Sequence, residues 1–180
     1  DQNAALHFAT RFNKTAAIDV LVEAGANIGA RNRDGDTPFH IACFNRSHEA
    51  LLSLLKHGAT VNAQDDFFRT PVMCAALKAG TQGTAEVVDS LLRAAADEVI
   101  INNYGTKAVD VIGDEVEEEE RMVEDVERVH KLLVNAPADR AWRRRGYLAR
   151  CRAYSDRVQR EQMIDGTHPT DTARRAGSGG

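Results

Sequence analysis

The side chains with the widest chemical range in this chain are six histidines and three cysteines, and their spacing limits what they can do. His7 and His40 are 33 residues apart, and neither has a cysteine or carboxylate beside it at the spacing of metal ligands. Cys43, Cys74 and Cys151 are widely spaced, and no serine or cysteine has a basic partner in a recognisable catalytic pattern. We therefore expect no metal, no cofactor and no enzyme, and we expect structural hydrogen bonds from both histidines.

Two further segments could hold charged ligands. Residues 80–84, with glycines at two positions, lack the lysine and the preceding strand of a phosphate-binding loop. The acidic run at residues 114–120 lacks the alternating oxygen ligands and the turn glycine of a calcium loop. We expect a surface loop and a solvated charge cluster.

The chain becomes regular when it is aligned with itself at a period of 33 residues. The third copy carries four extra residues within 79–84, and a weaker fourth copy begins at Asn103. The matching segments are Ala4–Ala9, Thr37–Ala42 and Thr70–Ala75, followed by Leu21–Ile28 and Leu54–Val61.

Each copy predicts a short helix followed by a second, more apolar helix. Thr37 and Thr70 can cap the short helix through their hydroxyls, and Pro38 and Pro71 take its first position, where a missing N–H costs nothing. Apolar residues at steps of three and four give the second helix one apolar face, which neighbouring helix pairs must cover by stacking. These residues are Ile18, Leu21, Val22, Leu51, Leu54, Leu55, Val87, Val88, Leu91 and Leu92.

A glycine follows the second helix in two copies but not in the third. Gly25 and Gly58 stand where a left-handed residue commonly closes a helix. Ala95 replaces that glycine in the third copy, so we expect this helix to end differently or to run on.

Period, motif and register resemble the ankyrin repeat, most completely in the second copy, at Asp34–Ala42 and Leu54–Ala63. The resemblance covers residues 1–113, and it extends to residue 134 with an interruption. It implies an all-α fold, an ankyrin-like α-solenoid of stacked helix-turn-helix repeats with short hairpin loops. The expected repeats are 1–33, 34–66, 67–103 and 104–134, the last one irregular with an acidic insertion.

The resemblance also implies a concave recognition surface, formed by the hairpin tips and the exposed sides of the short helices. In the third copy Phe67 and Phe68 stand at the tip, and Phe68 replaces a turn glycine. Phenylalanine does not readily adopt a positive φ, so we expect this turn to be built differently. Aromatic residues and arginine concentrate binding energy at interfaces, although either ring could instead fold back onto a neighbouring repeat. The candidate partner-binding residues are Arg33, Asp36, Phe44, Asn45, Phe67, Phe68, Arg69, Leu77, Lys78 and Tyr104.

The C-terminal quarter changes character after the break at Asn135–Pro137. Residues 135–161 predict a basic helix that caps the array, and residues 162–180 predict a disordered tail. Part of the basic segment resembles the second half of an IQ-type calmodulin-binding motif, although the first half is absent. The residues of this alternative are Trp142, Arg145, Gly146 and Arg150.

Composition supports a noncatalytic protein-interaction module or scaffold, which binds another protein. A hydrophobic content of 43% allows a core, and a net charge of −4 disfavours nucleic acid as a partner. No apolar run reaches the roughly 20 residues that cross a bilayer, and three unpaired cysteines indicate a reducing, intracellular and cytoplasmic setting. We expect a monomer. Because Asp1 and not Met opens the chain, the array could instead be a regulatory appendage of a larger enzyme or channel.

Overall fold

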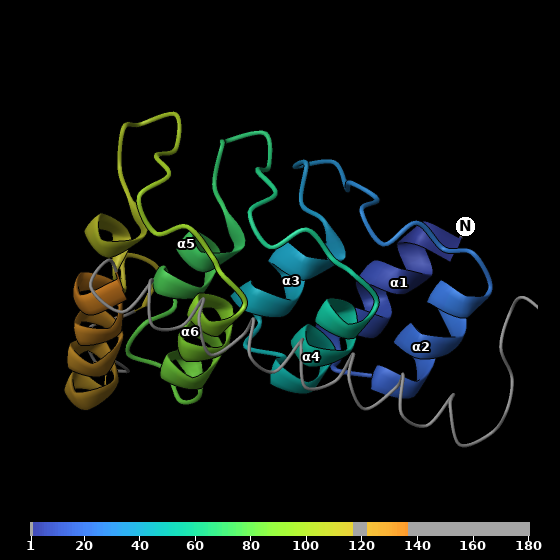
Figure 1. The fold of residues 1–180 in the computed structure, drawn as a ribbon, viewed down its shortest axis with the longest axis horizontal. Helices are drawn as coiled ribbons and strands as arrows, with labels where there is room; N and C mark the ends of the chain where they lie inside the picture. Colours follow the sequence, from blue (N-terminus) through green and yellow to red (C-terminus); the bar gives the residue numbers. More distant parts are fainter. Residues whose placement is uncertain (1, 117–121, 137–180) are drawn as a thin grey trace, which may run out of the picture. The chain divides into compact units, whose positions relative to one another are not determined.

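A computed structural model describes residues 2–116 and 122–136, and every regular element among these residues is a helix (Figure 1). The short helices α1, α3 and α5 stand in one row, and α2, α4 and α6 stand in a second row beside them. Long loops project from one side of the rows as hairpins. The elements are α1 (Gln2–Arg11), α2 (Thr15–Glu23), α3 (Pro38–Phe44), α4 (His48–Lys56), α5 (Pro71–Ala76), α6 (Thr84–Arg93), the 3₁₀ helix η1 (Ala108–Val111) and a helix over residues 123–136.

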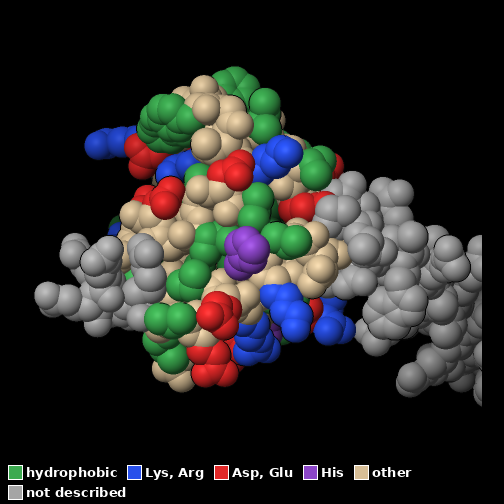
Figure 2. All heavy atoms as spheres, turned by 90° about the vertical axis from the view of Figure 1, so that its left-hand side faces the viewer, with side chains coloured by type: hydrophobic (Ala, Val, Ile, Leu, Met, Phe, Trp, Pro, Cys, Tyr) green, Lys and Arg blue, Asp and Glu red, His purple; other side chains and the backbone are tan. Residues whose placement is uncertain are grey.

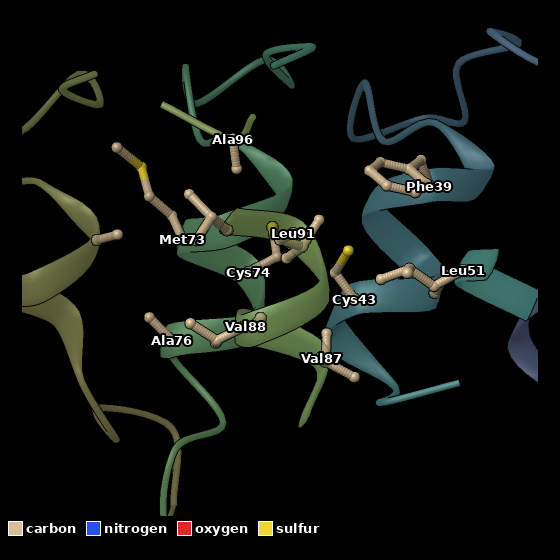
Figure 3. Close-up of a cluster of buried hydrophobic side chains, with 14 of the residues drawn as sticks. Phe39, Cys43, Leu51, Met73, Cys74, Ala76, Val87, Val88, Leu91 and Ala96 are labelled. Atoms are coloured by element: carbon tan, nitrogen blue, oxygen red, sulfur yellow. The ribbon is translucent and has the colours of Figure 1, made fainter. Parts of the chain in front are cut away.

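Successive helix pairs share one continuous apolar core, as the 33-residue period predicts. Figure 3 shows Cys43 and Leu51 of the second pair close to Cys74, Val87 and Leu91 of the third. Small side chains let the short helices approach closely, and the longer apolar side chains of α4 and α6 fill the space behind them. The all-α stacked architecture expected from the sequence is confirmed.

Thr37 caps α3 as predicted, but Thr70 does not cap α5. The Thr37 hydroxyl accepts the N–H of His40 at 3.4 Å and lies 2.9 Å from Nδ1 of the His40 ring. The Thr70 hydroxyl is fully buried and has no hydrogen-bond partner. Met73 occupies the position of His40 in this repeat and offers no polar group. The third repeat therefore lacks the threonine–histidine pair that closes the start of α3.

The prediction that Ala95 would change the end of its helix is wrong. Ala95 adopts a left-handed conformation with φ of 68°, close to the 85° of Gly58 at the equivalent position. Its N–H donates to the carbonyl of Leu92 at 3.2 Å, and the N–H of Ala96 donates to Leu91 at 2.9 Å. This is the closing pattern seen after α4, so the turn geometry is retained even with a Cβ atom in place.

The fourth repeat is irregular, and it is joined to the third by a buried carboxylate. Its first helix is reduced to η1, and the helix over residues 123–136 takes the place of its second helix. Asp125 in that helix is 7% exposed, and it accepts the N–H of Gly80 at 2.8 Å and the N–H of Ala85 at 3.3 Å. The four-residue insertion of the third repeat is thus anchored by the repeat that follows it.

Some sequence-based expectations lie beyond the described residues. Most of the acidic run, the predicted basic helix after Ala136 and the predicted tail fall within residues 117–121 and 137–180. Within the part of the chain that the structure describes, no helix has the length and apolar character that a membrane crossing requires.

Candidate protein-binding surface

An asparagine or aspartate side chain shapes the tip of each hairpin. In the second hairpin, one carboxylate oxygen of Asp65 accepts the N–H groups of Phe67 and Arg69, both at 2.8 Å. Asn32 and Asn102 make the same two bonds with the residues two and four positions further on. The three tips therefore share one backbone conformation, and their side chains alone distinguish them.

Phe68 adopts the backbone conformation of the glycines at its position, so the prediction of a differently built turn is wrong. Its φ is 59°, compared with 77° at Gly35 and 76° at Gly105. A left-handed conformation costs a residue with a Cβ atom about 1–2 kcal/mol. The Phe68 side chain is 55% exposed, so burial of its ring does little to offset that cost.

The aromatic side chains at the tips are open to solvent. Phe67 is 40% exposed, and its ring centroid lies 5.0 Å from the guanidinium carbon of Arg69. Tyr104, at the corresponding position of the next hairpin, is 75% exposed. Neither phenylalanine is packed into the core.

Arg69 holds the hairpins together and has little capacity left for a partner. Its Nε donates to the Asp65 carboxylate at 2.6 Å, and Nη2 lies 3.9 Å from the Asp36 carboxylate. Burial opposes the charge of Arg69, but the hydrogen bond from Asp65 and the nearby negative charges raise its pKa above the ordinary value. Asp36 shows the cost of this cluster, because desolvation raises its pKa despite His40 and Arg69.

The same cluster brings three potential metal ligands together. Side-chain atoms of Asp36, Asp65 and Cys74 lie within 4.8 Å of one another. Both oxygens of Asp65 already accept hydrogen bonds, and burial raises the pKa of the Cys74 thiol so that it stays protonated. A cation here would have to displace the Arg69 guanidinium, so we assign no metal to this cluster.

The two motif histidines join neighbouring repeats, as predicted. His7 Nε2 lies 3.0 Å from the carbonyl oxygen of Asp36, and His40 Nε2 lies 3.1 Å from that of Arg69. In His40 the other ring nitrogen accepts the N–H of Thr37 at 3.2 Å, which requires a neutral ring. Burial accordingly lowers the pKa of His40.

The exposed side of the short helices carries a row of paired side chains. Lys78 Nζ lies 4.4 Å from the ring centroid of Phe44 and 3.2 Å from the Glu115 carboxylate. The Asn45 amide donates to the carbonyl of Ile41 at 2.9 Å, within its own helix.

The remaining candidates differ in how much surface they offer. Arg33 is exposed and has no ion pair with a described residue. Leu77 is only 9% exposed, so it offers almost no surface to a partner. The four residues of the calmodulin-like alternative, Trp142, Arg145, Gly146 and Arg150, lie outside the described residues.

Sequence reasoning missed two aromatic residues on α1. Phe8 and Phe12 are each 62% exposed, and their spacing of four residues places them on one side of the helix. The repeat register could have found them, because Phe12 stands 33 residues before the candidate Asn45.

Comparisons with known proteins agree with this architecture. Residues 1–65 match a family model described as ankyrin repeats (3 copies). The inactive serine/threonine-protein kinase TEX14 of Bos taurus is 31% identical over 134 residues, which are 74% of this chain and 9% of that protein. The putative ankyrin repeat protein FPV031 of Fowlpox virus (strain NVSL) is 38% identical over 65 residues, which are 36% of this chain and 19% of that protein.

A third relative, the neurogenic locus notch homolog protein 4 of Homo sapiens, is 38% identical over 93 residues, which are 51% of this chain and 4% of that protein. The chain thus spans less than a fifth of the length of each of these three relatives. With the 33-residue period and the stacked helix pairs, these matches show that the chain is an ankyrin-repeat protein.

Proposed function

We propose that this chain is a noncatalytic protein-interaction module that binds a partner protein through its hairpin tips and the exposed sides of its short helices. Ankyrin repeats are generally protein-interaction modules. Within this array the proposed contact residues are the tip aromatics and the Phe44–Lys78 pair, extended by the exposed rings on α1. These residues are Phe8, Phe12, Phe44, Phe67, Phe68, Lys78 and Tyr104.

The observation that carries the proposal is the conformation of Phe68. An exposed ring on a left-handed residue lowers stability, while glycine stands at the equivalent position of both other hairpins. Backbone strain that the fold does not require often occurs where a side chain is used for binding. Phe67 and Tyr104 flank Phe68 with further exposed aromatic surface of the kind that dominates interface energetics.

The test compares three forms of the 180-residue chain: wild type, the double variant Phe67→Ser/Phe68→Ser, and the control Val20→Ser. Val20 is 64% exposed but lies on α2, in the other row of helices (Figure 1). Proteins retained from cell extract would be quantified by mass spectrometry. Loss of a contact worth about 2 kcal/mol weakens binding about 30-fold, so the double variant should lose proteins that wild type and control both retain.

Thermal melting separates binding from folding. Because both rings are exposed, the melting temperature of the double variant should stay within about 4 °C of wild type, which is less than 1 kcal/mol. A larger fall would show that the rings are structural. Equal retention of the same proteins by all three forms would contradict the proposal.

A second candidate function follows from the relatives. Each of the three is far longer than the region it shares with this chain, and one of them is an inactive kinase. The array would then act as a regulatory segment of a longer polypeptide. Immunoblotting of source tissue with an antibody against this chain tests this candidate, because a single band near 19.7 kDa would contradict it.

A further inference from the structure

Backbone hydrogen bonds join the three hairpins, residues 27–37, 60–70 and 97–107, into a ladder with the period of the repeats. The N–H of Asp66 donates to the carbonyl of Asp34 at 3.2 Å, and the N–H of Asn103 donates to that of Phe67 at 3.1 Å. These two bonds join equivalent positions of successive hairpins. The next acceptor in this register is the carbonyl of Tyr104, to which no described residue donates. The ladder therefore ends on a free acceptor.

Two side chains of the last hairpin face the same open end. In the earlier hairpins their positions reach forward: Asn62 accepts the N–H of Asp97 at 2.8 Å, and Arg31 donates to the carbonyl of Gln64 at 2.7 Å. Val99 stands at the position of Asn62, and Ile101 stands at the position of Arg31. By the same register both aliphatic side chains point to where another hairpin would lie.

The chemistry of this end differs from that of the internal junctions. Arg31 and Asn62 are polar, and Arg31 also pairs with Asp66 of the next hairpin. At the open end, Val99 is 48% exposed and Ile101 is 52% exposed. Figure 2 looks onto this end of the array, and hydrophobic side chains gather at its upper, hairpin side. An end that continued the internal pattern would carry polar groups there.

We propose that the open end of the hairpin row binds an extended segment of a partner protein. The segment adds to the ladder by donating one backbone N–H to the carbonyl of Tyr104, and it lays aliphatic side chains on Val99 and Ile101. An extended segment fits because the receiving groups continue a ladder built from extended backbone, and strand addition of this kind takes affinity from main-chain bonds. An aliphatic segment fits because an exposed apolar patch gains most from apolar cover. This surface does not use Phe67 or Phe68, so the proposal goes beyond the function proposed above.

The test selects linear twelve-residue peptides from a random phage library on the 180-residue chain. Enriched peptides should carry aliphatic residues at alternate positions, which is the spacing of one strand face. Their dissociation constants should rise about tenfold or more in Ile101→Asp and in the milder variant Ile101→Thr, as expected when an apolar contact is lost. The matched control Val20→Asp, on an equally exposed apolar residue of α2, should bind as wild type does.

A backbone substitution tests the hydrogen bond itself. Replacing the amide of one peptide residue by an ester removes its N–H and leaves the side chains in place. At one position of the peptide this change should weaken binding about threefold to tenfold, the usual contribution of a single hydrogen bond. An ester scan without a sensitive position would overturn the ladder.

Three further results would overturn the proposal. One is a selection that enriches no peptide, or only peptides whose binding ignores both Ile101 variants. Another is a benzoylphenylalanine at position 101 that crosslinks, without peptide, to the chain itself or to a second copy, because the end is then already covered. The last is a set of peptides that lose binding in Phe67→Ser/Phe68→Ser but not in Ile101→Asp. That result would support the function proposed above and reject this one.

Discussion

Phe68 and Ala95 are both left-handed residues with a side chain, but only Phe68 presents a ring to solvent. We predict that Ala95→Gly and Phe68→Gly each raise the free energy of unfolding by about 0.5–1 kcal/mol, since relief of the left-handed cost exceeds the added entropy of glycine in the unfolded chain. Urea denaturation of both variants measures this effect. Only Phe68→Gly should also weaken partner binding. Unchanged urea midpoints would show that neither conformation is strained.

His40 makes the stability of the array depend on pH. Burial lowers its pKa below the unfolded value of 6.5, so the unfolded chain takes up a proton there while the folded chain does not. The stability from this residue is complete above pH 6.5 and is lost as the pH falls through the folded pKa. We predict that urea midpoints measured from about pH 7.5 to about pH 5 fall more steeply for wild type than for His40→Gln. Parallel curves would contradict the prediction.

At the scale of elements, the third repeat lacks a junction that the first two possess. His40 binds both Thr37 and the carbonyl of Arg69, whereas Met73 leaves Thr70 without a partner. We predict that Met73→His raises the free energy of unfolding by about 1 kcal/mol, because the ring can bond to the Thr70 hydroxyl and to the next hairpin.

The control for this substitution is Met73→Leu, which keeps the site apolar and should change stability by less than about 1.5 kcal/mol. Thermal melting of both variants provides the measurement. A histidine variant that melts well below the leucine variant would mean that the ring is buried without partners.

The helices were predictable because threonine–proline starts and apolar spacing repeat at a fixed period. The conformations of Phe68 and Ala95 were not, because residue preference favours other turns there. Two carboxylate-bound N–H groups fix the first, and the closing hydrogen bonds of α6 fix the second. The tip aromatics could be proposed from sequence, but the ladder that ends at Tyr104 could not. Its register becomes visible only once the hairpins lie side by side.

At the scale of the whole array, stability is the sum of repeat terms and of the interfaces between neighbouring repeats. The interface between the third and fourth repeats depends on Asp125, which is buried and accepts two N–H groups. The nearby pair of Arg128 and Glu86, at 2.8 Å, is exposed on both sides and adds only about 0–1 kcal/mol. Loss of the Asp125 carboxylate should therefore loosen this interface more than loss of the ion pair.

We predict that Asp125→Ala lets the fourth repeat open while the first two repeats stay folded. The N–H groups of Gly80 and Ala85 would be left buried without an acceptor, which costs about 1–3 kcal/mol at this interface alone. Hydrogen exchange with mass spectrometry should show about tenfold or more loss of protection in η1 and in residues 123–136, with no change in α1 to α4. The control is Glu124→Ala, since Glu124 is the exposed neighbour of Asp125. If protection fell equally in all repeats, the array would unfold as a single unit and the interface terms would not be separable.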